Sequence, residues 1–285
     1  MAYNSGSVPT LAQHITAKFI PEIFSKDVLM HTMSHLVVAN AFTHRYKNDL
    51  KKGYKVSIPV MSEVSTTEVT PGTEPTSASA LGTAVSVTVD QWYEATVEIS
   101  PLMEIEEEAE YLEYAAKSAA YAIDKKIDTT VGALHSALAS SSVYGADGQT
   151  FTDDIFRALV QTLDENDVPD EGRFLIGDPS MKSDMLNIDK FVRGDFVNGA
   201  PTTNGKFGML YGAQVYITNN LTAATTGNYG VYAHPDAIGV VIQKNPNSNV
   251  WDLGWKFLTK IIVDCAWGKA ELRDVFGKSF YTRSA

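Results

Sequence analysis

Apolar and polar positions alternate over three stretches in the first half of the chain. Residues 54–60, 85–89 and 93–99 place apolar side chains at every second position, with lysine, serine, threonine, proline or glutamate between them. A period of two predicts β-strands that bury one face and expose the other. The sequence therefore predicts strands on both sides of residues 61–82.

Residues 61–82 themselves have a different character. They are rich in serine and threonine and contain few residues that could form a core. A connection of this length without its own core is uncommon in a compact domain, and is usually functional or unstructured. Two interpretations stay open, a surface loop and a long β-hairpin that lies on a neighbouring molecule.

After residue 100 the spacing of apolar residues changes to three and four. Ser100 can cap a helix, Pro101 suits its first position, and the following glutamates complement the helix dipole. We therefore expect one helix over 101–139 with a bend at Gly132. It would span roughly 58 Å, whereas a compact globule of this length is about 50 Å across. We therefore expect a flat, elongated molecule, which has excess surface that it can bury against other copies of itself.

The rest of the chain predicts an α+β fold. Before residue 45, one or two short amphipathic helices must dock on another surface to be stable. A mixed lobe is expected from about 145 to 250, followed by an all-β stretch over 251–284. Within the lobe we expect helices over 153–166 and from Asp178 onward, and strands over 173–176, 214–218, 229–233 and 238–243.

Composition narrows the class of protein. The 285 residues are 44 % apolar and 20 % charged, so the chain can bury the core of one large domain or two modest ones. No apolar run is long enough to cross a bilayer, and the N-terminus does not resemble a secretory signal. Cys265 is the only cysteine, and its apolar surroundings predict a buried thiol in a reducing cytosol. A net charge of −11 argues against a surface that grips nucleic acid, although not against a wall around it.

Catalytic and metal-binding patterns are weak throughout. His31 and His35 could share a helix face, but no third ligand accompanies them. The glycines Gly205, Gly208 and Gly212 do not have the spacing of a phosphate-binding loop, so we interpret them as turn residues. The glutamates over 104–113 lie along one helix and do not converge in a cleft. We therefore predict no catalytic, cofactor-binding or metal-binding residue, and no cofactor.

Two blocks of opposite charge stand out. Residues 44–55 contain five basic residues and one acidic residue, Asp49, which gives a net charge of +4. Residues 104–113 contain six glutamates, which give a charge of −6. Blocks of this kind could pair between adjacent subunits, where they would set register and specificity. The candidate contact residues are Arg45, Lys47, Lys51, Lys52, Lys55, Glu106, Glu107 and Glu110.

Four motifs in series resemble a known family. They are AAYAIDKKIDTTV at 119–131, RFLIGDPSMKSDMLNIDKF at 173–191, GKFGMLYGAQVYITNNL at 205–221 and YAHPDAIGVVIQ at 232–243. Their order is similar to that in the major capsid proteins of tailed bacteriophages, which have the Hong Kong 97-type fold. The resemblance implies an N-terminal arm at 1–45, an extended β-hairpin loop with strands leading to the spine at 46–100, and a spine helix of the peripheral domain at 101–145. It further implies an axial domain at 146–250 and return strands of the peripheral domain at 251–285.

The same resemblance implies a function. Hexamers and pentamers would form an icosahedral shell, which encloses double-stranded DNA without sequence-specific binding and has no membrane partner. Because Met1 stands close before the arm, we expect a separate scaffolding protein, and also a portal, with assembly in the bacterial cytoplasm and a final location in the virion. Two alternative functions stay open. One is an encapsulin-like compartment with the same fold, and the other, from a different class, is a hydrolase that uses acidic residues.

Overall fold

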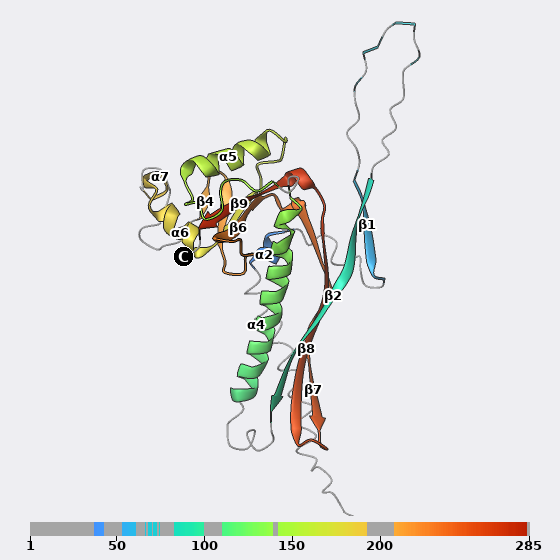
Figure 1. The fold of residues 1–285 in the computed structure, drawn as a ribbon. Helices are drawn as coiled ribbons and strands as arrows, with labels where there is room; N and C mark the ends of the chain where they lie inside the picture. Colours follow the sequence, from blue (N-terminus) through green and yellow to red (C-terminus); the bar gives the residue numbers. More distant parts are fainter. Residues whose placement is uncertain are drawn as a thin grey trace, which may run out of the picture.

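The computed structural model shows an elongated α+β molecule, with a long twisted sheet and a smaller lobe at one end (Figure 1). The structure describes residues 37–42, 53–60, 83–99, 110–138, 142–192 and 208–283, and positions 66, 68, 69, 71, 72 and 74. Most of the expected N-terminal arm therefore lies outside the described residues.

The long sheet has four antiparallel strands in the order β1-β2-β8-β7. Residues 85–89 and 93–99, predicted as two segments, form one strand, because a bulge between Val89 and Gln91 changes the register without ending the pairing. The 17 residues of this strand span roughly 55 Å. The four strands are β1 (Lys55–Val60), β2 (Thr83–Ile99), β7 (Ile238–Leu253) and β8 (Leu258–Glu271).

Helix α4 (Glu110–Gly132) lies along one face of this sheet (Figure 1). Ile123, Ile127 and Val131 follow the predicted spacing and are fully or almost fully buried. On the sheet side, Trp267 of β8 stacks on Tyr93 of β2 at 5.3 Å and donates a hydrogen bond to Thr130 of α4. The apolar stripe of the helix is therefore its contact with β2 and β8.

The predicted continuation of this helix to residue 139 is wrong. The α-helix ends at Gly132, and η1 (Ala133–Ser136) is a turn of 3₁₀-helix. Glycine supports a helix poorly, and the tighter turn brings Leu138 into the core against Gly277. The 23 described residues of α4 span roughly 35 Å, less than the roughly 55 Å of β2, so among the described elements the long strands set the length of the molecule.

The lobe contains a five-stranded sheet in the order β4-β5-β3-β6-β9, in which only β3 and β5 run parallel. Its helices begin as expected, because Thr152 caps α5, and Asp178 caps α6 with Pro179 in the first position. The helices are α5 (Asp153–Asp164), α6 (Pro179–Leu186) and α7 (Asp189–Val192). The strands are β3 (Phe174–Gly177), β4 (Met209–Leu210), β5 (Ala213–Ile217), β6 (Gly227–Ala233) and β9 (Gly277–Arg283).

Strand pairing does not follow the expected boundary at residue 250. β7 begins at Ile238 and belongs to the long sheet over its whole length. β9 returns to the lobe, where it pairs with β6 along 227–233, so 251–285 are not all return strands beside the spine helix. The chain passes between the two sheets at η2 (Pro235–Ala237) and η3 (Asp274–Phe276).

Two large hydrophobic cores follow from this arrangement, besides a small cluster of Ile58, Val87 and Val241 in the long sheet. The first lies between α4 and the long sheet and extends into the lobe through Phe174 and Ile176. The second fills the space between the five-stranded sheet and the lobe helices, around Phe156 and Tyr232. Phe276 packs against both cores, so the lobe and the long sheet are joined by packed side chains.

Candidate assembly surfaces

The two charge blocks lie almost entirely outside the described residues. Lys55 begins β1 and is exposed, and Glu110 is the first described residue of α4, without a described side chain. The structure therefore neither joins nor separates the predicted partners. The other six are Arg45, Lys47, Lys51, Lys52, Glu106 and Glu107.

The excursion between β1 and β2 leaves and returns at one place, because Val60 pairs with Thr83. Pro71 and Gly72 form a turn at the midpoint of 61–82, where Gly72 has the positive φ of 92° that glycine permits. All six described positions between 66 and 74 are exposed, and Val69 is 74 % exposed. These positions are available for contact with another molecule.

The face of the long sheet opposite α4 carries exposed aromatic residues. Trp92 of β2 is 74 % exposed and Trp251 of β7 is 59 % exposed. Beneath them, buried Asp264 accepts a hydrogen bond of 3.0 Å from Trp92 Nε1 and forms an ion pair with Lys244. The buried charge is thus paired, and it holds Trp92 in place on an open, mixed apolar and polar face.

The tip of the β7–β8 hairpin is a second exposed aromatic surface. Leu253 and Leu258 are the last pair of the two strands, and residues 254–257 form the loop. Trp255 and Phe257 are 76 % and 78 % exposed, and the Lys256 ammonium lies 4.7 Å from the Trp255 ring centre. The tip stands at the end of the long sheet away from the lobe (Figure 1).

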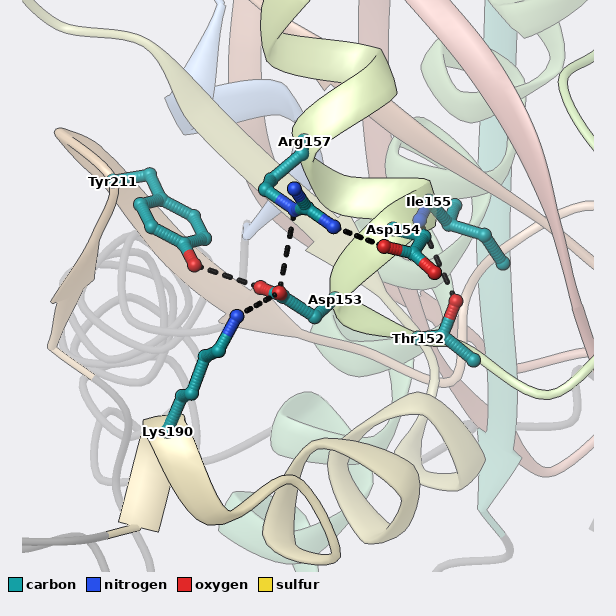
Figure 2. Close-up of polar contacts among 7 residues, drawn as sticks. All are labelled: Thr152, Asp153, Asp154, Ile155, Arg157, Lys190 and Tyr211. Carbon is teal, nitrogen blue, oxygen red and sulfur yellow. Dashed lines mark hydrogen bonds and ion pairs between the residues drawn. The ribbon is translucent and has the colours of Figure 1, made fainter.

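A polar cluster connects three segments of the lobe (Figure 2). The Asp153 carboxylate at the start of α5 accepts hydrogen bonds of 2.7 Å from Lys190 Nζ on α7 and from the Tyr211 hydroxyl between β4 and β5. Arg157 Nε lies 3.3 Å from the same carboxylate, and its guanidinium also pairs with Asp154. Asp153 therefore links the segments on both sides of 193–207 to one helix end.

The charges of this cluster change its acid–base properties. Partial burial acts to raise the pKa of Asp153, but the hydrogen bonds from Lys190 and Tyr211 and the charges of Lys190 and Arg157 hold it below its usual value. Partial burial and the hydrogen bond to the Asp153 carboxylate raise the pKa of Tyr211 to about 12. At neutral pH the Asp153 carboxylate is therefore ionised, whereas the Tyr211 hydroxyl keeps its proton and donates it to that carboxylate.

Neither a metal centre nor a membrane span is found in the part of the chain that the structure describes. Within the described ranges, His, Cys, Asp and Glu do not gather in groups of three that could hold a metal ion. No described helix has the length and apolar character required to cross a bilayer. Cys265 is buried, as predicted. Gly212 occupies the β4–β5 turn with a φ of 79°, while His31, His35 and Gly205 lie outside the described residues.

Comparison with known protein families identifies the class of protein that carries these surfaces. A family profile described as phage capsid protein matches residues 69–256, which include α4, two strands of the long sheet, β2 and β7, and most of the lobe. This chain belongs to the phage capsid protein family. The capsid protein therefore has a structural role, and the sequence-based prediction of a capsid protein is confirmed.

Solved structures show the same fold for this capsid protein. A chain from Mycobacterium phage Che8 is 20 % identical, with a TM-score of 0.72 and coverage of 86 % of this chain and 90 % of that one. The capsid structure of the cyanophage P-SCSP1u gives 16 % identity, a TM-score of 0.65 and coverage of 82 % and 85 %. A virus-like particle from Pyrococcus furiosus gives 11 % identity, a TM-score of 0.57 and coverage of 92 % and 99 %. No curated protein sequence matches this chain.

The first two motifs that carried the resemblance form regular structure. Residues 119–131 lie in α4 and include the buried Ile123, Ile127 and Val131, and 173–191 include β3, α6 and the start of α7. The sequence analysis missed the aromatic tip and the Asp153 cluster. The sequence signal that could have indicated the tip is a tryptophan directly after a turn glycine, at Gly254-Trp255. No local signal indicates the Asp153 cluster, because its members come from three separate segments.

Proposed function

We propose that copies of this chain assemble into hexamers and pentamers, which close into an icosahedral shell that encloses double-stranded DNA. The match of the phage capsid family profile to residues 69–256 carries the proposal. A separate scaffolding protein and a portal are the expected partners, and assembly takes place in the cytoplasm of the bacterial host. The net charge of −11 supports a container wall that does not bind its DNA by sequence.

The shape of the subunit supports a role in a thin wall. Only one face of the long sheet is covered by α4, and the other face exposes Trp92 and Trp251. A subunit of this form leaves apolar surface that neighbouring copies can bury. The exposed positions around Pro71 and Gly72 are suited to lie on such a neighbour, as are residues 1–45 in the role of an arm.

We further propose that the chain has two domains, a peripheral domain that contains α4 and an axial domain that is formed by the lobe. In this proposal β7 belongs to the peripheral part, because it pairs with β8, and β9 belongs to the axial part, because it pairs with β6. The basic block around Lys51 and Lys52 and the acidic block around Glu106 and Glu107 remain proposed partners between adjacent subunits. Their support is the opposed charge of the two blocks.

Expression of the full chain in bacteria, alone and together with the scaffolding gene from its own genome, tests the proposal. Sedimentation velocity and negative-stain images should show capsomers or closed shells. A protein that remains monomeric under both conditions and at every concentration would contradict self-assembly. A globular enzyme of the hydrolase class would behave in that way.

The content of particles from the natural source separates a virion from an encapsulin-like compartment. The fold shared with the Pyrococcus furiosus virus-like particle does not distinguish them, since it concerns architecture alone. We expect double-stranded DNA that resists nuclease until the shell is opened. Particles filled with a protein cargo and free of DNA would favour the compartment.

A further inference from the structure

The lobe and the long sheet are connected by turns of one type. The residues that the structure describes contain three turns of 3₁₀-helix, and each stands where the chain passes between these two parts. η1 follows α4 and leads into the lobe, η2 joins β6 to β7, and η3 joins β8 to β9. The hydrogen bonds of a 3₁₀ turn have poorer geometry than those of an α-helix, and such turns often mark hinges. We call the region formed by η1, η2 and η3 the joint.

Two of the turns, η2 and η3, are bound to each other. His234 N donates a hydrogen bond of 2.9 Å to Phe276 O, and Leu272 N donates one of 2.8 Å to Ala237 O. The ring of His234 meets the ring of Phe276 edge to face at 5.6 Å, and Phe276 packs against both cores. η2 and η3 therefore form one bonded unit between the lobe and the long sheet.

The third turn, η1, packs against β6 and β9 through an aromatic stack. The buried ring of His135 lies 4.1 Å from that of Tyr229 with 14° between their planes, and Tyr229 packs on Tyr281 of β9 at 5.1 Å. Nδ1 of His135 is buried and has no hydrogen-bond partner among the described residues. A protonated ring would keep a cation–π contact with Tyr229, but it would bury a charge and an unbonded donor. The stack therefore favours the neutral imidazole.

The charged groups around His135 offer no counter-ion. The strands β6 and β9 contain tyrosines, Lys278 and Arg283, but no acidic residue. In the adjoining segments, Asp128 of α4 accepts its hydrogen bonds from the α2 side, and Asp147 accepts its hydrogen bonds from residues 225–226. Burial accordingly lowers the pKa of His135. A proton on this ring is therefore unfavourable as long as η1 stays packed on β6.

His234 in the same joint has a different environment. Its Nδ1 atom accepts a hydrogen bond of 3.2 Å from the amide of Asp236 and lies 3.9 Å from the Asp236 carboxylate. The end of β8 and η3 add Glu271, Arg273 and Asp274 to this side of the joint. A proton on His234 therefore meets acidic groups, and the contact between η2 and η3 can persist when the ring is charged.

We propose that the joint is an acid-sensitive hinge, in which protonation of His135 releases η1 from β6 and the lobe turns relative to the long sheet about η2 and η3. At neutral pH the uncharged ring stays in the stack, and the joint keeps the observed geometry. In the released state the ring lies in water and binds a proton with the ordinary pKa of histidine, about 6.5. The released population therefore rises by up to about tenfold for each pH unit below that value. The hinge is a property of the folded subunit and does not depend on the proposed shell.

Two spin labels on the full chain, one on each side of the joint, test the proposal. Thr150→Cys in the lobe and Asp252→Cys in β7 place labels at exposed positions, whereas Cys265 is buried. Pulsed electron paramagnetic resonance of the unassembled subunit should show a second distance between the labels in acid. Its population should rise by up to about tenfold between about pH 7.5 and about pH 5.5. The near-ultraviolet circular dichroism should stay unchanged, which separates a turn of the lobe from unfolding.

Three variants assign the effect to one residue. His135→Phe keeps a ring for the stack but cannot bind a proton, so a single distance should persist at both pH values. His135→Gln is neutral but does not stack, so the second distance should be present already at neutral pH and should not increase in acid. His234→Asn keeps an acceptor for the amide of Asp236 and removes the titrating ring. This matched control should respond to acid as the wild type does.

Four results would overturn the inference. The first is a wild-type subunit with the same distances at both pH values. The second is a His135→Phe variant that responds to acid as the wild type does. The third is a response that His234→Asn abolishes, since the sensor would then be His234. The fourth is a loss of the near-ultraviolet signal together with the change in distance, because acid would then unfold the subunit and not turn the lobe.

Discussion

The carboxylate of Asp128 on α4 accepts a hydrogen bond of 3.2 Å from the backbone amide of Ala39, 89 residues earlier in the chain. The same carboxylate accepts hydrogen bonds of 3.3 Å from the amide of Val37 and from the Asn220 side chain. Asp128 thus caps the short helix α2 (Val38–Ala41) and fixes it against α4. Residues 37–42, which are the described part of the proposed arm at 1–45, are thus held against α4 at this point.

Replacement of Asp128 by alanine should lower the free energy of unfolding by about 1–2 kcal/mol, because it leaves buried amide donors without an acceptor. Burial raises the pKa of the Asp128 carboxyl, and its hydrogen bonds oppose this effect only in part. The native state therefore holds its proton to a higher pH than the unfolded state, and this group stabilises less as the pH rises through that interval. Urea unfolding at several pH values measures both effects.

The exposed Lys125 on the same helix provides the control for Asp128. Lys125→Ala should change stability by no more than about 0.5 kcal/mol. Equal losses in the two variants would contradict a specific role for the carboxylate.

The Asp153–Tyr211 hydrogen bond should be measurable by a double-mutant cycle. Tyr211→Phe and Asp153→Ala should each destabilise the subunit, and the double variant should lose less than their sum, with a coupling of about 1 kcal/mol. Because the pKa of Asp153 lies below its usual value, this contribution is present above the pKa of an unfolded aspartate and is lost as the pH falls through the lower, folded pKa. Additive losses at neutral pH would exclude the interaction.

The same pair gives a spectroscopic signature. Subtraction of the Tyr211→Phe absorbance titration from that of the wild type should show a phenol with a pKa of about 12. In the Asp153→Asn background the difference titration should move toward 10, the ordinary pKa of tyrosine, since the carboxylate no longer opposes ionisation. A difference curve that Asp153→Asn leaves unchanged would show that burial alone causes the shift.

His135 in η1 should make the subunit sensitive to mild acid. Its ring is buried and stacks on Tyr229 with centres 4.1 Å apart, and its Nδ1 atom has no hydrogen-bond partner among the described residues. Burial lowers the pKa of the imidazole below 6.5, so the unfolded state binds the proton more readily. Stability should therefore be constant above pH 6.5 and fall as the pH decreases toward the folded pKa.

His135→Phe keeps an aromatic ring for stacking but cannot be protonated. The melting temperature of this variant should depend less on pH between about 6.5 and 5 than that of the wild type. Parallel curves over this interval would show that other groups cause the acid sensitivity.

Gly227 at the start of β6 should tolerate no side chain. A Cβ atom there would lie 1.8 Å from the carbonyl oxygen of Thr282 in the paired strand β9. Gly227→Ala should therefore cost at least about 2 kcal/mol, because backbone must move. At Gly208 a Cβ atom meets nothing within 4 Å, so Gly208→Ala is the matched control and should be nearly neutral.

The paired charge blocks predict a swap that restores assembly. Lys51→Glu with Lys52→Glu should impair shell formation, because like charges would then face each other between subunits. Adding Glu106→Lys and Glu107→Lys to the same chain should recover it. A fourfold variant no better than the first pair, or a first pair without an assembly defect, would remove this contact from the proposal.

Local pattern predicted most of the elements. The period of two along 54–60 and 93–99 indicated β1 and much of β2, because alternation is a property of each strand by itself. The spacing of Ile123, Ile127 and Val131 identified the buried face of α4 for the same reason. Asp178 followed by Pro179 marked the start of α6 through chemistry confined to one turn.

Local pattern failed where the deciding partner is distant. The end of α4 depends on the core position of Leu138, and the place of β9 depends on its pairing with β6, about fifty residues earlier. The bulge at Asp90 depends on the register with β8. None of these partners can be recognised from the neighbouring sequence.

The sequence by itself determined the class of fold, the buried faces of the main elements and the resemblance to capsid proteins, since each depends on short-range spacing and on the order of motifs. Only the tertiary structure decided which side chains remain exposed and which strained residues are held. Tyr211 and Phe257 both have a positive φ in a hairpin turn, but the ring of Tyr211 packs against the lobe and the side chain of Phe257 is 78 % exposed. That difference arises from packing between elements far apart in the chain, because burial is set by the whole folded surface and not by neighbours in sequence.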